Sequence, residues 1–165
     1  MTIRMKEKVA LVTGGTTGMG FATAKQLAAE GAKVVISGRN PESGAAAEEA
    51  ITAEGGDVAF IQADVSDSAQ VDALIDGTIE RFGGLDVAFN NAGMEALGPI
   101  GDLPNQVFEQ VIQTNVNGLW FLMKREIGHM LANGGGVILN NSSVCLLYTS
   151  PSPRDATLSR MPSSA

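Results

Sequence analysis

Short apolar runs alternate with longer segments of helical periodicity through most of the chain. Runs rich in β-branched residues predict buried strands at 8–13, 33–37, 58–62, 85–89 and 136–140. Between them, apolar side chains at helical spacing predict helices at 18–30, 41–54, 68–82 and 104–133, the last interrupted near 115–118. Strands alternating with helices of this length indicate βαβ units. We therefore expect an α/β fold, a doubly wound parallel sheet with right-handed crossovers and strand order 3-2-1-4-5.

Composition and charge narrow the class of protein. The chain has 165 residues, of which 44% are hydrophobic and 18% charged, as expected for one globular domain. Its net charge of −7 argues against nucleic acid as a partner, since an acidic surface repels phosphate backbones. No apolar run approaches the ~20 residues that span a bilayer, so no membrane partner is expected. One cysteine and no signal-like N-terminal stretch suit a cytoplasmic protein.

The chain changes character after Val144. The last 15 residues hold three of the six prolines, and the last 21 hold the single cysteine and the single tyrosine. Residues 145–150 back-translate to TGT CTC TTA TAC ACA TCT, the transposase mosaic end of short-read sequencing libraries. Residues 151–155 continue that adapter, and residues 159–165 match its flow-cell end after a three-codon gap.

This codon order favours translated adapter over the alternative, a natural linker rich in Ser and Pro. Such scars are excluded from fold reasoning. We therefore expect the natural part of the chain to be residues 1–144, which stop after the fifth strand. Residues 145–165 are expected to be a non-native, disordered tail.

A glycine-rich turn joins the first expected strand to the first helix. It reads Thr13-Gly14-Gly15-Thr16-Thr17-Gly18-Met19-Gly20. Glycines at such a place permit a tight turn, close approach of the backbone to a pyrophosphate, and close contact between helix and strand. The helix N-terminus adds free N–H groups and a positive dipole end. The turn lacks the G-x-G-x-x-G spacing and the lysine of a P-loop, so alone it is also compatible with a purely structural role.

The spacing Thr-Gly-x-x-x-Gly-x-Gly resembles that of the short-chain dehydrogenase/reductase family. Three further motifs strengthen the resemblance, which covers residues 6–144: Asp64-Val65 after the third strand, Asn90-Asn91-Ala92-Gly93 after the fourth, and Asn115-Val-Asn-Gly in the long helical region. The resemblance implies that residues 1–144 form an incomplete dinucleotide-binding domain of the Rossmann type. It also implies an NAD(P)-dependent oxidoreductase acting on an alcohol or ketone, without a metal. The implied cofactor-binding residues are Thr13, Gly14, Thr16, Thr17, Gly18, Met19, Gly20, Arg39, Asp64, Val65, Asn90, Ala92 and Gly93.

The same resemblance bears on cofactor choice and catalysis. An acidic residue at the position of Gly38 would favour NAD; here none is present, and Arg39 follows. Arginine suits a 2′-phosphate, so NADP is favoured, with NAD as the alternative. By the same comparison Asn115 belongs to the catalytic tetrad, and Ser143 would hydrogen-bond the substrate carbonyl oxygen.

The family's Tyr-x-x-x-Lys pair has no match in this sequence. Tyr148 follows Ser143 too closely, Ser152 stands where the lysine would be, and Lys124 is the last lysine. We therefore expect this chain to be inactive, and the parent enzyme, whose natural sequence continues beyond residue 144, to be active. We also expect the parent enzyme to be a homo-oligomer. A non-catalytic dinucleotide-binding module and a non-functional fragment stay open as alternatives.

Overall fold

A computed structural model describes residues 4–142 of the chain. Five parallel strands form one sheet in the order β3-β2-β1-β4-β5, as the sequence predicts. Their bounds are Val9–Thr13 (β1), Lys33–Gly38 (β2), Asp57–Gln62 (β3), Val87–Asn90 (β4) and Val137–Asn140 (β5). The helices are Gly18–Ala29 (α1), Pro41–Ala53 (α2), Ser68–Phe82 (α3), Asn105–Ile112 (α4) and Leu119–Ala132 (α5), with a π-helical segment η1 at Gln113–Gly118.

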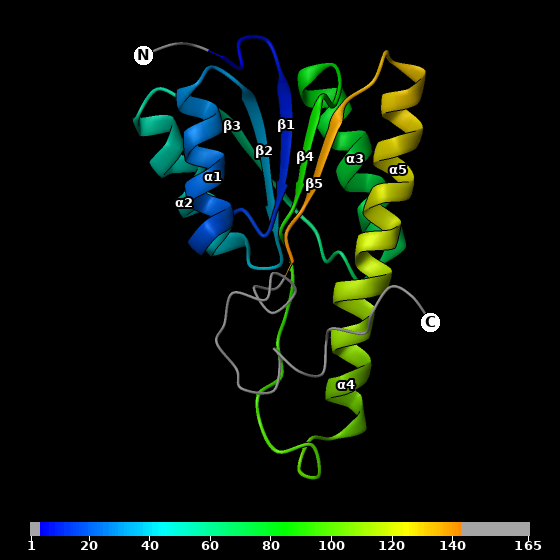
Figure 1. The fold of residues 1–165 in the computed structure, drawn as a ribbon. Coiled ribbons are helices and arrows are strands. Elements are labelled where there is room, and N and C mark those ends of the chain that lie inside the picture. The colour runs from blue at the N-terminus through cyan, green and yellow to red at the C-terminus, as the bar shows by residue number, and fades with distance from the viewer. Residues whose placement is uncertain (1–3, 143–165) are drawn as a thin grey trace, which may run out of the picture.

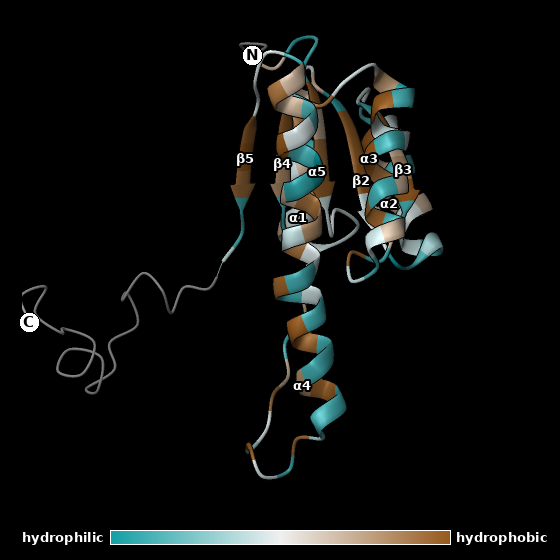
Figure 2. Ribbon diagram, turned by 90° about the vertical axis from the view of Figure 1, so that its right-hand side faces the viewer, coloured by the Kyte–Doolittle hydropathy of each residue, from teal (hydrophilic) through white to brown (hydrophobic). Residues whose placement is uncertain are grey.

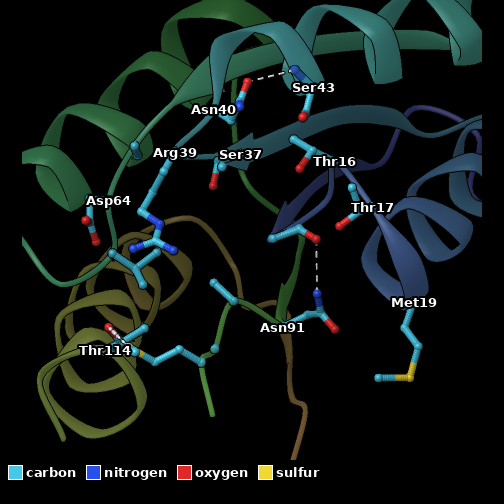
Figure 3. Close-up of a pocket in the computed structure, with 17 residues that line it drawn as sticks. Thr16, Thr17, Met19, Ser37, Arg39, Asn40, Ser43, Asp64, Asn91 and Thr114 are labelled. Carbon is cyan, nitrogen blue, oxygen red and sulfur yellow. Dashed lines mark hydrogen bonds between the residues drawn. The ribbon is translucent and has the colours of Figure 1, made fainter. Parts of the chain in front are cut away.

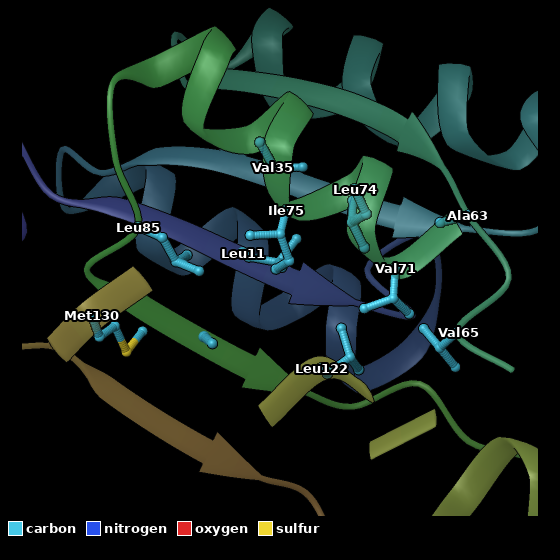
Figure 4. Packing of buried hydrophobic residues seen from close by; sticks show 11 residues of the cluster. Leu11, Val35, Ala63, Val65, Val71, Leu74, Ile75, Leu85, Leu122 and Met130 are labelled. Atoms are coloured by element: carbon cyan, nitrogen blue, oxygen red, sulfur yellow. The ribbon is translucent and has the colours of Figure 1, made fainter. Parts of the chain in front are cut away.

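Helices cover both faces of the sheet, which makes three layers (Figure 1). On one face, α1 and α2 pack their small side chains, such as Ala24 and Ala47, against Val12 and Ile36 of the strands. On the other face, α3 and α5 bury larger side chains; Figure 4 shows Leu74, Ile75 and Leu122 packed around Leu11. Figure 2 shows that the strands are largely apolar, that the helices mix polar and apolar residues, and that β5 lies at the edge of the sheet. Each strand of the centre is thus buried on both sides, as in other parallel sheets.

Local sequence explains where the helices begin and end. The Asn40 side chain accepts hydrogen bonds from the N–H groups of Glu42 and Ser43 and so caps α2. Asp67 caps α3 in the same way, and Gly83, with φ of 88°, ends it in the left-handed region. The expected interruption of the long helix is confirmed: the chain passes through η1 between α4 and α5.

The main difference from the expected strands is at β4. The sequence predicts 85–89, and the strand spans Val87–Asn90. Leu85 is buried in the core, but the Asp86 side chain takes hydrogen bonds from the Val9 N–H and from Lys8, which ties the loop before β4 to the start of β1. Within residues 4–142, no helix is long and apolar enough to cross a membrane.

Candidate active site

A cleft lies at the carboxyl ends of the strands, where the order of the sheet reverses between β1 and β4. Ligands of open α/β sheets bind at this kind of switch point. The cleft comprises two adjoining cavities of about 480 Å³ and 600 Å³. The first lies over the ends of β1, β2 and β3 (Figure 3), and the second over the ends of β4 and β5. They share the lining residues Met19, Val65, Asn91, Ala92, Gly93 and Met94.

The glycine-rich turn between β1 and α1 borders the first cavity. Gly18 has φ of +55°, a region that favours glycine, and a Cβ there would point into open space. Gly20 is buried, and a Cβ there would collide with the Gly14 carbonyl oxygen. The turn therefore leaves room on its outer side and allows close packing of α1 on its inner side.

The N-terminus of α1 is open to an anion. Thr17 is the N-cap residue, yet its side chain makes no capping hydrogen bond, and the first helical turn holds no acidic residue. The first N–H groups of a helix need acceptors, and the helix dipole favours negative charge there. Because Thr16, Thr17 and Met19 line the cavity beside this end, a diphosphate fits the chemistry of the site.

Thr13 sits beneath the cleft and lines neither cavity. Its buried hydroxyl accepts hydrogen bonds from the N–H groups of Asn91 (3.0 Å) and Ala92 (3.1 Å). In return, the Asn91 side-chain amide donates to the carbonyl oxygens of Thr13 and Gly14. These bonds fix the segment after β4 against the glycine-rich turn, so Thr13 acts by positioning both sides of the cleft.

The end of β2 contributes polar side chains to the first cavity. Arg39 is exposed, and Figure 3 shows its guanidinium extending into the cavity. Among the described residues Arg39 forms no salt bridge. The Ser37 hydroxyl lines the same cavity; it is buried and, within residues 4–142, has no hydrogen-bond partner. A buried polar atom without a partner is rare in proteins, so this wall is suited to a polar ligand.

Asp64 stands on the wall after β3. One carboxylate oxygen, Oδ1, accepts hydrogen bonds from the Ser66 N–H (3.0 Å) and hydroxyl (2.7 Å). The Asp64 N–H donates to the Gln70 side chain. These bonds hold the carboxylate in a fixed turn, and within residues 4–142 its other oxygen, Oδ2, has no partner. It is therefore free to accept a hydrogen bond from a ligand.

Asn115 lies in the π-helical segment η1 and borders the second cavity. Its side chain accepts from the Met94 N–H (3.0 Å) and donates to the Met94 carbonyl oxygen (2.8 Å). Gly118 packs so closely on Val65 that a Cβ there would lie 2.9 Å from the Val65 carbonyl oxygen. Single turns of π-helix occur frequently at functional sites. Here the segment brings Asn115 to the loop that follows β4.

A buried polar network lies at the ends of β4 and β5. The Asn90 side-chain amide donates both to Glu126 Oε2 (2.9 Å) and to Asn140 Oδ1 (3.0 Å). Glu126 is fully buried on α5, and burial raises its pKa to about 7, against the effect of the Asn90 hydrogen bond. Asn141, which follows β5, connects the ends of the two strands, because its N–H donates to the Asn90 carbonyl oxygen at the end of β4. Asn90 and Asn141 both line the second cavity.

Most of the site residues expected from the sequence lie together along this cleft. Thr13, Gly18 and Gly20 line neither cavity and shape the turn instead. Ser143 lies outside the described residues, as do Val144 and the expected adapter-derived tail; its neighbour Ser142 lines the second cavity. The remaining expected residues line one or both cavities: Gly14, Thr16, Thr17, Met19, Arg39, Asp64, Val65, Asn90, Ala92, Gly93 and Asn115.

The sequence analysis missed several residues of the cleft. Ser37, Asn40 and Ser43 line the first cavity together with Arg39, and the main chain of Met94 binds the Asn115 side chain. For Glu126 a signal existed: it lies four residues after Leu122 and four before Met130, so it falls on the buried face of α5. Within residues 4–142, no cluster of three His, Cys, Asp or Glu side chains is arranged to hold a metal ion.

Known proteins resemble the chain in sequence and in fold. The short chain dehydrogenase profile matches residues 8–153, and so ends inside the expected tail. A 3beta-hydroxysteroid dehydrogenase of Mediterraneibacter gnavus is 42% identical over 90% of the chain and 54% of its own length. An NADP-dependent (R)-specific alcohol dehydrogenase of Lentilactobacillus kefiri is 40% identical over 87% of the chain and 57% of its own length.

The crystal structure of levodione reductase superposes with a TM-score of 0.83 and 37% sequence identity, over 89% of this chain and 58% of that one. This match supports a Rossmann-like parallel sheet with flanking helices. The chain spans just over half the length of these relatives. On the profile match and these relatives, the chain belongs to the short chain dehydrogenase family.

Proposed function

We propose that this chain is the dinucleotide-binding part of an NAD(P)-dependent oxidoreductase that interconverts alcohols and ketones. The observation that carries the proposal is the uncapped N-terminus of α1, open toward a cleft that the family motifs line. A bound nicotinamide cofactor would supply the hydride acceptor or donor. The residues of the chain bind and orient it: the N–H groups of α1 hold the diphosphate, and Asp64 accepts a hydrogen bond from the adenine side.

NADP is the favoured cofactor in this proposal. Gly38 offers no carboxylate to a ribose hydroxyl pair, and Arg39 lines the first cavity without a salt bridge among the described residues. A charged guanidinium in contact with a 2′-phosphate forms hydrogen bonds that contribute on the order of 1.5–3 kcal/mol. NAD binding by the same cleft is the alternative.

A binding measurement tests this choice. We expect Arg39→Ala to weaken NADP⁺ binding about 10- to 150-fold, the fold-change that corresponds to about 1.5–3 kcal/mol. We expect NAD⁺ binding to stay nearly unchanged. Arg81→Ala is the matched control, because Arg81 lies over the Phe82 ring, away from the lining of either main cavity. Stronger binding of NAD⁺ than of NADP⁺, together with no effect of Arg39→Ala, would contradict the preference.

In the catalytic half of the proposal, Asn115 and Ser143 act in the parent enzyme with a Tyr-Lys pair that the printed sequence does not contain. A positioned acid/base group contributes about 10²–10⁴ in rate. We therefore propose that the printed chain binds the dinucleotide without turnover. Because that pair is absent, a non-catalytic dinucleotide-binding module is the second candidate function.

Turnover of two chains separates these candidates. One is the printed chain; the other carries, after residue 144, the continuation found in uninterrupted genomic DNA. We expect nicotinamide absorbance changes with an alcohol and ketone panel only for the second. No turnover from the continued chain would favour the binding module, and turnover of the printed chain that is lost in Tyr148→Phe would make Tyr148 a catalyst.

The same genomic DNA tests the adapter origin of residues 145–165, which stays a prediction. We expect its sequence to diverge from this chain at about residue 144. Genomic reads that continue into Cys-Leu-Leu-Tyr-Thr-Ser would make the tail natural. The homo-oligomeric state of the parent and its cytoplasmic location also stay predictions.

A further inference from the structure

Within residues 4–142, two buried atoms of facing residues, one at the end of β4 and one in the middle of α5, have no hydrogen-bond partner. They are Glu126 Oε1 and Asn90 Oδ1. Their residues are already joined by one hydrogen bond, from Asn90 Nδ2 to Glu126 Oε2 at 2.9 Å. Glu126 is fully buried and Asn90 is 5% exposed, so water is a poor substitute for the missing partners. Buried polar atoms are rarely left in this state.

A neutral carboxylic acid resolves both atoms at once. An acid and a primary amide form a cyclic pair, in which the amide N–H donates to one acid oxygen and the acid O–H donates to the amide oxygen. The structure shows the first of these bonds, and the second would join the two unpartnered atoms. The other Asn90 N–H already donates to Asn140 Oδ1 at 3.0 Å. The protonated acid therefore satisfies every polar atom of the Asn90 side chain.

Ionised Glu126 leaves Glu126 Oε1 and Asn90 Oδ1 without hydrogen bonds. A carboxylate has no proton to donate, so Oε1 and the amide oxygen would face one another as two acceptors. No cation within residues 4–142 pairs with this carboxylate. On α5, Arg125 pairs with Asp72 and Asp76 of α3, and before β4 Asp86 pairs with Lys8, with His129 of α5 adding a favourable charge there. Burial raises the pKa of Glu126 to about 7, which agrees with a preference for the neutral acid.

We propose that Glu126 is a positioning residue that, as a neutral acid paired with Asn90, fixes the ends of β4 and β5 at the second cavity. Asn90 lines that cavity, and beside it Asn141, whose N–H donates to the Asn90 carbonyl oxygen, and Ser142 line the wall at the end of β5. Ionisation of Glu126 opens the pair and loosens this wall. Dinucleotide binding therefore weakens as the pH rises through neutrality. This inference rests on the proposed function for its binding consequence alone.

Glu126→Gln is the decisive variant. Its amide presents an N–H where the acid presents an O–H, so it keeps both bonds of the pair at every pH. Glu126→Ala removes both bonds. Glu109→Gln is the matched control, since Glu109 is exposed on α4. His129→Gln is a second control, because it removes the one histidine of the chain.

The first measurement needs no ligand. In the full chain labelled with ¹³C at the glutamate carboxyls, we expect one resonance, missing from Glu126→Gln, to titrate near pH 7. Since the folded chain then holds a proton that the unfolded chain has released, stability falls as the pH rises from the ordinary glutamate range to about 7. We expect this decline in the wild type and in both controls, and not in Glu126→Gln. A Glu126 resonance that titrates in the ordinary glutamate range would overturn the proposal.

The second measurement is NAD⁺ affinity, because the charges of NAD⁺ do not titrate near neutrality. Between about pH 5.5 and about pH 8.5 we expect the wild-type Kd to rise at least about fivefold, the lower end of typical coupling between two sites. We expect Glu126→Gln to hold its low-pH affinity throughout. A Gln variant that binds as weakly as Glu126→Ala would refute the pair. Failure of every variant to bind NAD⁺ or NADP⁺ would instead overturn the proposed function. The carboxyl titration would then still show whether Glu126 is a neutral acid paired with Asn90.

Discussion

The two sides of the cleft are stabilised by different means. On the side of β1, β2 and β3, helices cover both faces, and the four central residues of β2 are buried. On the side of β4 and β5, no residue of α4 or of β5 is buried. Ten of the eleven large exposed hydrophobic side chains in the described part of the chain fall between Leu97 and Leu139. The first side is held by a core on both faces of the sheet. On the second side the core includes Leu122 and Met130 of α5 but no fully buried residue of β5, and hydrogen bonds such as those of Asn90 and Asn115 add to it.

Truncation of one strand leucine on each side should break this comparison most directly. Leu11 of β1 is fully buried, so Leu11→Ala should lower the free energy of unfolding by about 2–5 kcal/mol. Leu139 of β5 is 50% exposed, so Leu139→Ala should cost only about 0.5 kcal/mol. Urea denaturation of the full chain measures both values. Similar losses in the two variants would show that β5 has a core of its own.

Removal of the Thr13 hydroxyl should have the next largest effect, because it joins the two sides. Thr13→Val keeps the shape but leaves the N–H groups of Asn91 and Ala92 without their acceptor. We expect a loss of about 2–4 kcal/mol in denaturant unfolding, and recovery of most of it in Thr13→Ser. If Val is tolerated and Ser brings no gain, the hydroxyl does not hold the two strand ends together.

Helix capping sharpens the comparison at a smaller scale. Asn40 caps α2, whereas Pro104 before α4 makes no capping bond through its side chain. Asn40→Ala should therefore destabilise the chain by about 1 kcal/mol. Amide hydrogen exchange in the first turn of α2 locates the effect. A change confined to α4 would contradict the assignment of the cap.

The smallest effect is a loss of stability in acid. Partial burial acts to raise the pKa of Asp86, but hydrogen bonds from Lys8 and the Val9 N–H outweigh it, and the pKa lies below its usual range. The pair therefore stabilises the chain above the ordinary Asp pKa, and this contribution disappears as the pH falls through the lowered value. We expect Asp86→Asn to cost about 0.2–1 kcal/mol near neutrality and to reduce the acid-induced loss. An unchanged acid limb in this variant would assign that loss to other carboxylates.

The fold was more predictable than the site because it depends on periodic patterns. Strand order followed from βαβ connectivity, and the break near Asn115 followed from its polar Asn-Val-Asn-Gly run. Glu126 was missed because a charged residue within a helix normally reads as exposed, and only its register with Leu122 and Met130 places it inside. Ser37 lines the cavity because β2 lies between β1 and β3, and no local sequence pattern encodes that arrangement.

The close approach of Gly38 to Thr16 bears on how cofactor preference can evolve. A Cβ at position 38 would lie 3.0 Å from Thr16 Cγ2, tighter than ordinary van der Waals contact. Gly38→Asp, the change that would supply a carboxylate for NAD in the proposed function, therefore presses on Thr16 of the glycine-rich turn. Thr16→Ser first removes the obstructing methyl group. The order of the two substitutions therefore matters. If Thr16→Ser comes first, the methyl group that crowds a Cβ at position 38 is gone. If Gly38→Asp comes first, the Thr16 side chain has to move.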